Sequence, residues 1–252
     1  MFHQGKTRLA VTLGAVFLIV VSLSIFMSGV SGHLNWIARQ HKTEKNGDSK
    51  GTAEGGVRCP LDGALLSSLP KDRPVAVVID DLPSARPQAG LNSADIVYET
   101  LAEGGITRLL AVYYHGEAPR VGPIRSARFY FIQLARGLNA VLVHSGGSPD
   151  ALEYMKTNNT AHIDEFRFAR GFWRDSLRKA PHNLYSDTKT LHRLVQEIGL
   201  NKQVTVPALK IVGVKKNSSE DDGLQSDRIE VFISKSNRLI YIYDSQEKVY
   251  RR

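Results

Sequence analysis

Residues 73–150 read RPVAVVIDDLPSARPQAGLNSADIVYETLAEGGITRLLAVYYHGEAPRVGPIRSARFYFIQLARGLNAVLVHSGGSPD, and this stretch decides the fold. It contains four apolar runs rich in β-branched residues, and each run ends in a polar cluster. The runs are Val75–Ile79, Ile96–Tyr98, Leu109–Tyr114 and Ala140–Val143. Short apolar runs of this kind predict buried strands, and open α/β sheets bind ligands just beyond the carboxyl ends of their strands. The stretch therefore predicts a binding site at the edge of a sheet.

Helical patterns follow the strands and define the expected fold class. Apolar residues at helical spacing occur in Ser126–Gly137, in residues 148–157 and in residues 186–199. Ser148 is the expected N-cap of the second helix, and Ser186 or Asp187 that of the third. Strands that alternate with helices predict an α/β fold, with a largely parallel sheet flanked by helices.

The C-terminal part of the chain predicts a second, β-rich unit. A polar run follows Val214, and then Glu230–Ile233 and Arg238–Tyr243 have the pattern of paired strands, with a third strand beginning at Lys248. We expect residues 58–214 to form the α/β ligand-binding domain. Residues 215–252 would form a linker and an incomplete β-rich C-terminal domain.

The N-terminus predicts a membrane anchor. Leu9–Val30 contains no charged residue and follows Lys6 and Arg8. As a helix it would be roughly 33 Å long, enough to cross the hydrocarbon core of a bilayer. The expectation is a single-pass signal anchor in the cell membrane, with residues 1–8 cytoplasmic, residues 31–57 a flexible linker and the bulk of the chain extracytoplasmic. A cleaved signal peptide is the alternative, because Val30–Gly32 offers small residues.

Charge and cysteine content exclude several classes of partner. Residues 1–56 hold six Lys/Arg and three Asp/Glu, so only +5 of the formal charge of +8 belongs to the rest of the chain. That value indicates no nucleic-acid partner. Cys59 is the single cysteine, which excludes an intrachain disulfide and a cysteine-rich metal site. We expect no metal and no cofactor.

Seven sequence motifs resemble one known family. They are CPLDG at 59–63, RPVAVVIDD, ARPQAGLNSADIVYE, EGGITRLLAVY, GPIRSAR, HSGGSPDA and APHNLY at 180–185. Together they resemble the YerB-like lipoprotein family, bacterial envelope proteins with a domain of unknown function. The resemblance implies an α/β first domain, an extracytoplasmic location and no established reaction.

The chain departs from this family pattern in two places. Members are commonly anchored by a lipid on a cysteine, whereas this sequence carries the apolar span described above. Members also continue through a second, β-rich domain, and the ending YIYDSQEKVYRR resembles only its start. A site that needs the second domain would therefore be incomplete.

Arginines dominate the middle of the deciding stretch. Ala118–Pro149 contains four arginines, one histidine and no carboxylate. Arg125 and Arg128 flank the start of a predicted helix, where free backbone N–H groups already favour an anion. Guanidinium groups bind carboxylate or phosphate with two parallel hydrogen bonds. The alternative is that these arginines pair internally with the carboxylates of the same stretch.

Other polar motifs offer further chemistry, each with a structural alternative. HSGGSPD provides glycines and a helix start that suit an anion, but adjacent strand residues point to opposite faces, so His144 is a poor base for Ser145. The pair Asp80-Asp81 could hold a metal or act as acid and base with nearby glutamates, or simply cap a turn. His182-Asn183 could join such a site or be structural.

A second group of arginines lies at residues 167, 170, 174 and 178. This spacing would place them on one face of a helix, although Gly171 interrupts it. The interleaved aromatic residues, Phe166, Phe168, Phe172 and Trp173, are expected in the core. The family resemblance implies that Arg174 faces the site.

The leading hypothesis is a membrane-anchored domain that binds an anionic or polyhydroxylated cell-envelope ligand. The expected ligand-binding residues are Asp80, Arg86, Glu99, Glu103, Arg108, Arg125, Ser126, Arg128, His144, Ser148, Asp150, Arg174, His182 and Asn183. One alternative is an envelope hydrolase that acts on a glycan or phosphoester, with Asp80, Glu99 or His144 as acid–base groups. Another is an interaction module of an envelope protein complex, whose arginines would be structural.

Overall fold

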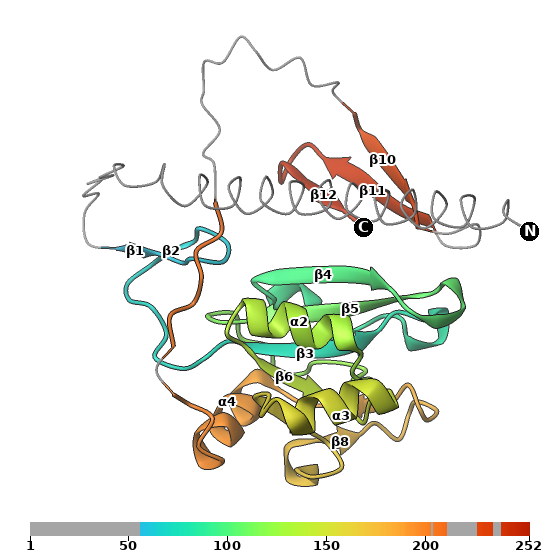
Figure 1. The fold of residues 1–252 in the computed structure, drawn as a ribbon. Helices are drawn as coiled ribbons and strands as arrows, with labels where there is room; N and C mark the ends of the chain where they lie inside the picture. Colours follow the sequence, from blue (N-terminus) through green and yellow to red (C-terminus); the bar gives the residue numbers. More distant parts are fainter. Residues whose placement is uncertain (1–55, 203, 211–225, 234–237) are drawn as a thin grey trace, which may run out of the picture. The chain divides into compact units, whose positions relative to one another are not determined.

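A computed structural model describes residues 56–202, 204–210, 226–233 and 238–252. A five-stranded sheet organises the first of these ranges, in the order β4-β5-β3-β6-β7 (Figure 1). Its strands are β3 (Val75–Asp80), β4 (Ile96–Leu101), β5 (Thr107–Tyr113), β6 (Val141–His144) and β7 (His162–Asp164). The four apolar runs of the sequence are thus strands of one sheet, and β7 is a fifth that the sequence analysis did not predict.

The sheet is mixed, so the prediction of a largely parallel sheet is wrong. Strand β6 is parallel to β3 and to β7, whereas β5 is antiparallel to both β3 and β4. The connection from β4 to β5 explains the difference. Only Ala102–Ile106 lies between these strands, including the short 3₁₀ helix η3 (Glu103–Gly105). A parallel crossover needs about a dozen residues or more, so this connection forces an antiparallel turn.

Three α-helices accompany the sheet: α2 (Phe129–Gly137), α3 (Pro149–Thr157) and α4 (Thr188–Glu197). Both predicted N-cap positions are confirmed: Ser148 precedes α3 but makes no capping hydrogen bond, whereas Asp187 accepts one from the Thr190 N–H. Helix α2 begins three residues later than predicted. The reason is that Ile124 and Ala127 form β-bridges, with Ile79 and Gly147.

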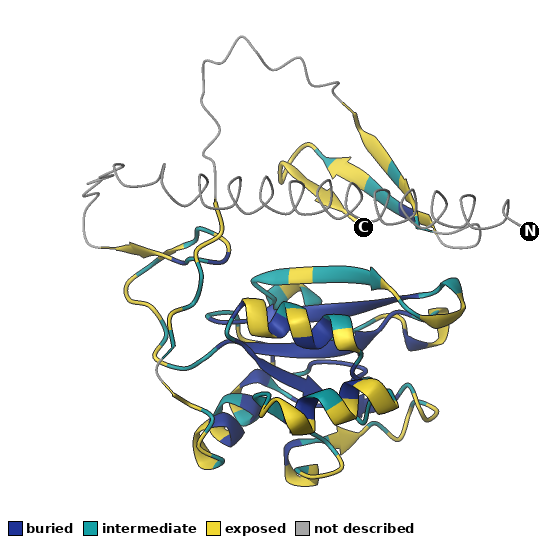
Figure 2. Ribbon diagram, viewed as in Figure 1, coloured by how far each residue is buried: buried dark blue, intermediate teal, exposed yellow. Residues whose placement is uncertain are grey.

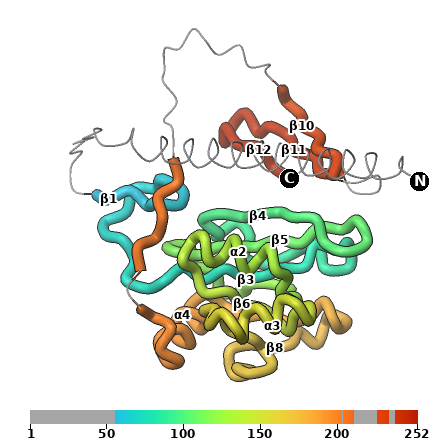
Figure 3. Tube along the Cα trace, in the orientation of Figure 1, coloured from blue at the N-terminus to red at the C-terminus, as the bar shows by residue number. Residues whose placement is uncertain are grey.

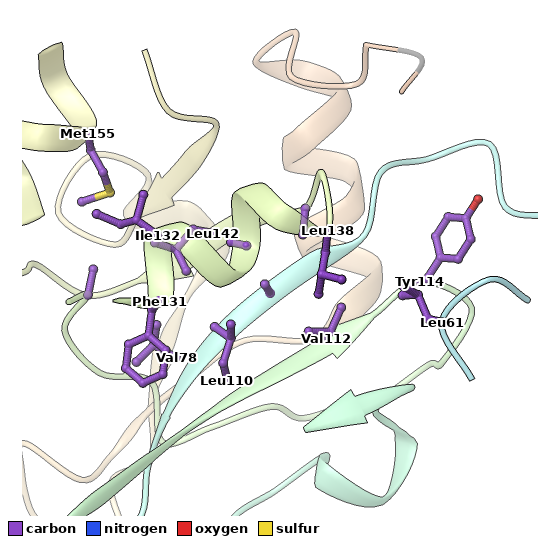
Figure 4. Packing of buried hydrophobic residues seen from close by; sticks show 14 of the residues in the cluster. Leu61, Val78, Leu110, Val112, Tyr114, Phe131, Ile132, Leu138, Leu142 and Met155 are labelled. Carbon is purple, nitrogen blue, oxygen red and sulfur yellow. The ribbon is translucent and has the colours of Figure 1, made fainter. Parts of the chain in front are cut away.

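Both faces of the sheet are buried, which explains why its central strands are continuous apolar runs. Along β3, Ala76 and Val78 enter one core cluster, whereas Val75, Val77 and Ile79 enter another. Helices α2 and α3 cover the first cluster, where Phe131, Ile132, Leu142 and Met155 pack together (Figure 4). Helix α4 covers the second through Leu191, Leu194 and Val195. Figure 2 shows the buried centre of the sheet.

Short elements complete the domain, and Figure 3 traces their path. They are β1 (Val57–Arg58) with β2 (Leu65–Leu66), β8 (Trp173–Arg174) with β9 (Leu184–Tyr185), and the 3₁₀ helices η1 (Pro83–Ala85), η2 (Leu91–Ser93) and η4 (Ala169–Gly171). The helix considered for the second arginine group is absent, because η4 and β8 occupy that segment. The expectation that its aromatic residues lie in the core is correct for Phe168 and Phe172, which pack against it, but wrong for Phe166 and Trp173, which are exposed.

The C-terminal strands form a separate three-stranded antiparallel sheet, β10-β11-β12. Its strands are β10 (Arg228–Phe232), β11 (Arg238–Asp244) and β12 (Val249–Arg251). This agrees with the paired strands expected there.

The expected membrane span, Leu9–Val30, lies outside the described residues and stays a prediction. Within the ranges given above, every helix is too short or too polar to cross a bilayer.

Candidate functional site

Four strands bring polar residues to one edge of the sheet. The parallel strands β3, β6 and β7 end there at Asp80, His144 and Asp164. Strand β5 runs the other way and begins at the same edge, with Arg108 opposite Asp80. We call the polar groups at this edge, and in the loops that contact it, the strand-end cluster. Polar groups therefore converge at this edge, as predicted. Three of the strands contribute residues at their carboxyl ends, whereas β5 contributes residues at its start.

The GPIRSAR segment crosses this edge and positions its arginines by backbone hydrogen bonds. The Arg125 N–H donates to the Val78 carbonyl at 2.9 Å, and the Arg125 carbonyl accepts from the Ser145 N–H at 3.1 Å. The segment is thereby fixed between β3 and the loop after β6. Gly122 begins it at φ +145°, and a Cβ there would lie 2.7 Å from the Leu184 carbonyl oxygen. Only glycine fits this close approach.

Asp80 is the buried hub of the cluster. Its Oδ1 accepts from the Leu82 N–H at 3.1 Å, and its Oδ2 lies 2.7 Å from His182 Nδ1. Arg125 Nε lies 3.1 Å from the same Oδ2 in an ion pair. The far nitrogen of the His182 ring, Nε2, lies 3.1 Å from Ser84 Oγ. A fully buried carboxylate thus has partners on both oxygens, which offsets the cost of removing its charge from water.

A second group of contacts is built on Glu165, the residue after β7. The Ser145 hydroxyl donates to Glu165 Oε2 at 2.8 Å, and Arg174 Nη2 donates to Oε1 at 2.9 Å. Arg174 Nη1 also donates to Asn183 Oδ1 at 3.2 Å. Arg174 therefore reaches the cluster, as the family resemblance implied, and it links the loop after β7 to the segment that carries His182.

A third group joins Glu103 to two arginines. Arg128 pairs with Glu103, and Arg108 Nη2 lies 3.8 Å from the same carboxylate. The hydrogen bond from Arg128 lowers the pKa of Glu103 to about 2. Burial lowers the pKa of Arg108, and Arg128 adds to this effect by charge repulsion. Arg108 also donates to the Ser126 carbonyl at 3.4 Å, so the contact of Ser126 is through its backbone.

Asp81 organises the part of the site next to β4. Arg86 donates to both of its oxygens at 3.2 Å, and the Thr107 hydroxyl donates to Oδ2 at 2.7 Å. Burial opposes ionisation of Asp81, but the hydrogen bond from Thr107 and the charges of Arg252 and Arg86 outweigh it, and the pKa of Asp81 is lowered. Burial raises the pKa of neighbouring Glu99. Two nearby carboxyls thus have opposite pKa shifts.

His144 lies in the cluster but faces inward. Its ring is fully buried, Nδ1 donates to the Gly146 carbonyl at 2.8 Å, and Nε2 lies 2.9 Å from His162 Nδ1. Burial lowers the pKa of His144 to about 4 and lowers that of His162 as well. Both ring nitrogens of His144 have protein partners, so its side chain supports the loop after β6. Ser145 bonds Glu165 instead of either histidine.

Two expected ligand-binding residues lie apart from these hydrogen-bonded groups. Asp150 is exposed in the first turn of α3, and a hydrogen bond with Ser148 lowers its pKa. No ion pair joins Asp150 to an arginine among the contacts of the described residues. Ser148 and Asp150 therefore border the cluster without entering its network.

The opposite edge of the sheet carries a different group of polar residues. Cys59, Asp62 and His115 each offer a ligand atom, and these atoms lie within 4.8 Å of one another. His115 Nε2 lies 2.9 Å from carboxylate oxygens of both Asp62 and Asp95. Burial raises the pKa of the Cys59 thiol. The set has the residue types of a cation site, and the predicted absence of a metal stays a prediction.

The sequence analysis did not identify several members of the cluster, namely Ser84, Thr107, His162, Asp164 and Glu165. Glu165 follows a strand, as the other polar residues do, but β7 has only three residues and no recognisable period. Ser84 lies in the 3₁₀ helix η1, where nothing in the local pattern distinguishes it. The expectation that site residues follow the carboxyl ends of strands, applied to HIDE at 162–165, would have found Glu165. No comparable signal marks Ser84.

Comparisons with known proteins agree with the motifs. The family described as "Protein of unknown function (DUF3048) N-terminal domain" matches residues 63–201. The "Putative lipoprotein YerB" of Bacillus subtilis (strain 168) is 36% identical over 199 residues, which are 78% of this chain and 60% of that protein. The crystal structure of the Bacillus subtilis YerB protein matches with a TM-score of 0.63 at 32% identity, over 77% of this chain and 65% of that one.

The chain therefore spans 60% of the length of the curated relative that it matches. The resemblance inferred from the seven motifs is confirmed. Its matched region, residues 63–201, contains the whole strand-end cluster, and the chain belongs to the DUF3048 family of proteins of unknown function, together with YerB.

Proposed function

We propose that this chain is a membrane-associated protein of the cell envelope that binds a small anionic or polyhydroxylated ligand at its strand-end cluster. The location rests on its relative, which is named a putative lipoprotein. The apolar segment Leu9–Val30 would serve as the anchor in place of a lipid. Fractionation with and without protease treatment of intact cells tests the location, since a cytosolic, protected chain would contradict it.

The observation that carries the binding proposal is the convergence of three arginines from two segments that lie far apart in the sequence. Arg125 and Arg128 come from the segment that crosses the strand ends, and Arg174 comes from β8. Their side chains are 21%, 18% and 48% exposed, respectively. Each is held by a carboxylate of the protein and still reaches solvent. Preoriented guanidinium groups bind an anion at a smaller entropic cost than free ones.

The carboxylates that pair with these arginines limit which ligands suit the site. Arg125, Arg128 and Arg174 are paired with Asp80, Glu103 and Glu165. A purely anionic ligand would therefore meet carboxylates as well as arginines. A ligand that carries hydroxyl groups beside its negative charge suits the site better, because its hydroxyls can donate to Glu103 and Glu165. Acidic sugars and phosphorylated polyols have this combination of groups.

Thermal unfolding with a panel of ligands tests the proposal. The panel contains acidic glycan fragments, glycerol phosphate, inorganic phosphate and a neutral sugar. A ligand at 100 times its Kd adds about 2.7 kcal/mol to stability, which raises the Tm by several degrees. We expect a shift with a ligand that carries both charge and hydroxyls, and a smaller one with phosphate or the neutral sugar alone.

Arg128→Ala is the informative variant, because its partner Glu103 is 60% exposed and no buried charge is left behind. Arg170→Ala is the matched control: it removes an arginine that pairs with the exposed Glu197 at 3.0 Å, outside the cluster. The ligand shift should disappear in Arg128→Ala and persist in Arg170→Ala. Equal shifts in both variants would contradict a site at the strand-end cluster.

A further inference from the structure

Three side chains of the strand-end cluster form a linear hydrogen-bonded relay. Ser84 Oγ lies 3.1 Å from His182 Nε2, and His182 Nδ1 lies 2.7 Å from Asp80 Oδ2. The residues come from η1, from the loop before β9 and from the end of β3. Neither their spacing in the sequence nor their positions relative to strand ends predicts that these three residues meet. The fold alone does so.

The contacts fix the direction in which the relay moves a proton. Asp80 is a carboxylate acceptor, so Nδ1 of the neutral imidazole is the nitrogen that carries the hydrogen. Nε2 is then the acceptor, and the Ser84 hydroxyl donates to it. Leu82 N–H holds the other oxygen of Asp80 at 3.1 Å, which fixes the plane of the carboxylate. This tautomer and order of contacts are those by which a serine hydroxyl is activated in acyl-transfer enzymes.

We propose that Ser84 is the nucleophile of an esterase site, with His182 as general base and Asp80 as the residue that positions the imidazole. The substrate class is a carboxylic ester that carries negative charge near its scissile carbonyl. The proposal goes beyond ligand binding at the cluster, because it adds a reaction and a residue, Ser84, that the binding proposal does not use.

Exposure and charge around Ser84 support this assignment. Asp80 is fully buried, His182 is partly exposed, and Ser84 is exposed, so the relay leads from the core to the surface. Arg178 Nη1 donates to the Ala85 carbonyl at 3.0 Å, and Arg125 Nη1 donates to the Pro181 carbonyl at 3.4 Å. Two positive charges thus lie beside the residues next to Ser84 and His182. They favour the negative charge that develops on a carbonyl oxygen during attack.

The reaction balances with water as the only co-reactant. Ser84 Oγ attacks the carbonyl carbon while its proton passes to His182 Nε2. The bond between that carbon and the alkoxy oxygen then breaks, and the alcohol leaves with the proton from Nε2. Water attacks the acyl-serine, His182 takes a proton from it, and Ser84 leaves with that proton. The products are one carboxylic acid and one alcohol, and the side chains return to their starting state.

A purely structural role predicts different behaviour. The Ser84–His182 hydrogen bond also ties η1 to the loop before β9, and such a tie needs no reactivity at Ser84. A structural serine has ordinary nucleophilicity and does not react with a serine-directed fluorophosphonate. An activated serine forms a covalent phosphonyl adduct, with fluoride as the leaving group. Reactivity at one serine therefore separates the two roles.

The experiment treats the 252-residue chain in detergent with a fluorophosphonate, and measures the intact mass and the modified peptide. Hydrolysis of p-nitrophenyl acetate is followed in parallel. The variants are Ser84→Ala, His182→Gln and, as the matched control, Ser68→Ala, which changes another exposed serine outside the cluster. A thermal melt of each variant confirms that it is folded.

We expect one adduct, on Ser84, and hydrolysis that falls at least about 100-fold in Ser84→Ala and His182→Gln but not in Ser68→Ala. A folded chain that forms no adduct overturns the proposal, as does hydrolysis that persists in folded Ser84→Ala. The adduct on Ser84 and the ligand-induced shift of the Tm are separate measurements on the unchanged chain. The esterase and the binding proposal can therefore fail separately.

Discussion

His182 Nδ1 lies 2.7 Å from Asp80 Oδ2, although 102 residues separate the two along the chain. This contact joins the end of the central strand β3 to the loop that precedes β9. Arg125 binds the same carboxylate oxygen from the segment between β5 and α2. Three distant parts of the chain are thus fixed to one buried charge, and the geometry of the strand-end cluster depends on it.

Removal of Arg125 should therefore destabilise the fold. Arg125→Ala leaves the Asp80 carboxylate buried with hydrogen bonds from His182 and the Leu82 N–H but no arginine beside it, and we expect a loss of about 3 kcal/mol in the free energy of unfolding. Asp80→Asn removes the charge, so Arg125→Ala should cost less in that background. Urea denaturation of the two single variants and the double variant measures the coupling, which should exceed about 1 kcal/mol. Additive losses would mean that the ion pair contributes nothing.

Gly122→Ala should destabilise the GPIRSAR segment. Gly122 has φ +145°, and an added Cβ would lie 2.7 Å from the Leu184 carbonyl oxygen and 2.8 Å from the Tyr185 ring. We expect a loss of about 2 kcal/mol or more, from backbone strain and this overlap. Gly137→Ala is the control, because a Cβ there meets nothing within 4 Å and lies in helix α2. Chemical denaturation should show no loss in the control, and equal losses would refute the steric argument.

Much of the fold follows from local pattern, but strand direction does not. The continuous apolar run at residues 75–79 predicted a buried strand. The run is continuous because both faces of β3 are covered by core residues. The prediction of a largely parallel sheet failed at β4 and β5. The ten residues between Tyr98 and Leu109 contain no helical spacing. That was the available signal for a tight antiparallel connection.

The sequence predicted where the site lies in the fold, but it did not predict which side chains contact one another there. Asp80, Arg125 and Arg174 do lie in the strand-end cluster. The inward direction of His144 depends on which face of β6 meets the core, and the contact between Ser84 and His182 depends on loop geometry. A sequence without an alignment specifies neither, because side-chain direction reverses with a shift of one residue.

The N-cap residues of α3 and α4, Ser148 and Asp187, should contribute differently to the free energy of unfolding. The Asp187 carboxylate accepts the Thr190 N–H at 2.7 Å, whereas the Ser148 side chain caps no N–H of α3. Asp187→Ala should therefore cost about 1 kcal/mol of stability, and Ser148→Ala should cost clearly less. Thermal or urea unfolding of both variants makes the comparison. A Ser148→Ala loss as large as that of Asp187→Ala would contradict the assignment of the cap.

The buried pair His144 and His162 should make stability depend on pH. Burial lowers the pKa of His144 from 6.5 to about 4, and the pKa of His162 shifts in the same direction. The unfolded chain therefore binds more protons than the folded chain below pH 6.5. The stabilisation is complete above that pH and is lost as the pH falls towards 4, by about 3 kcal/mol for a shift of this size.

Urea denaturation between pH 7.5 and 4.5 should show this loss in the unchanged chain and a flatter profile in His144→Asn. His115→Asn is the control, because His115 lies at the opposite edge of the sheet, where Asp62 and Asp95 face its ring. Removal of His115 should leave the contribution of His144 in place. A profile in His144→Asn as steep as that of the unchanged chain would mean that other groups cause the acid sensitivity, and that His144 does not stay neutral through burial.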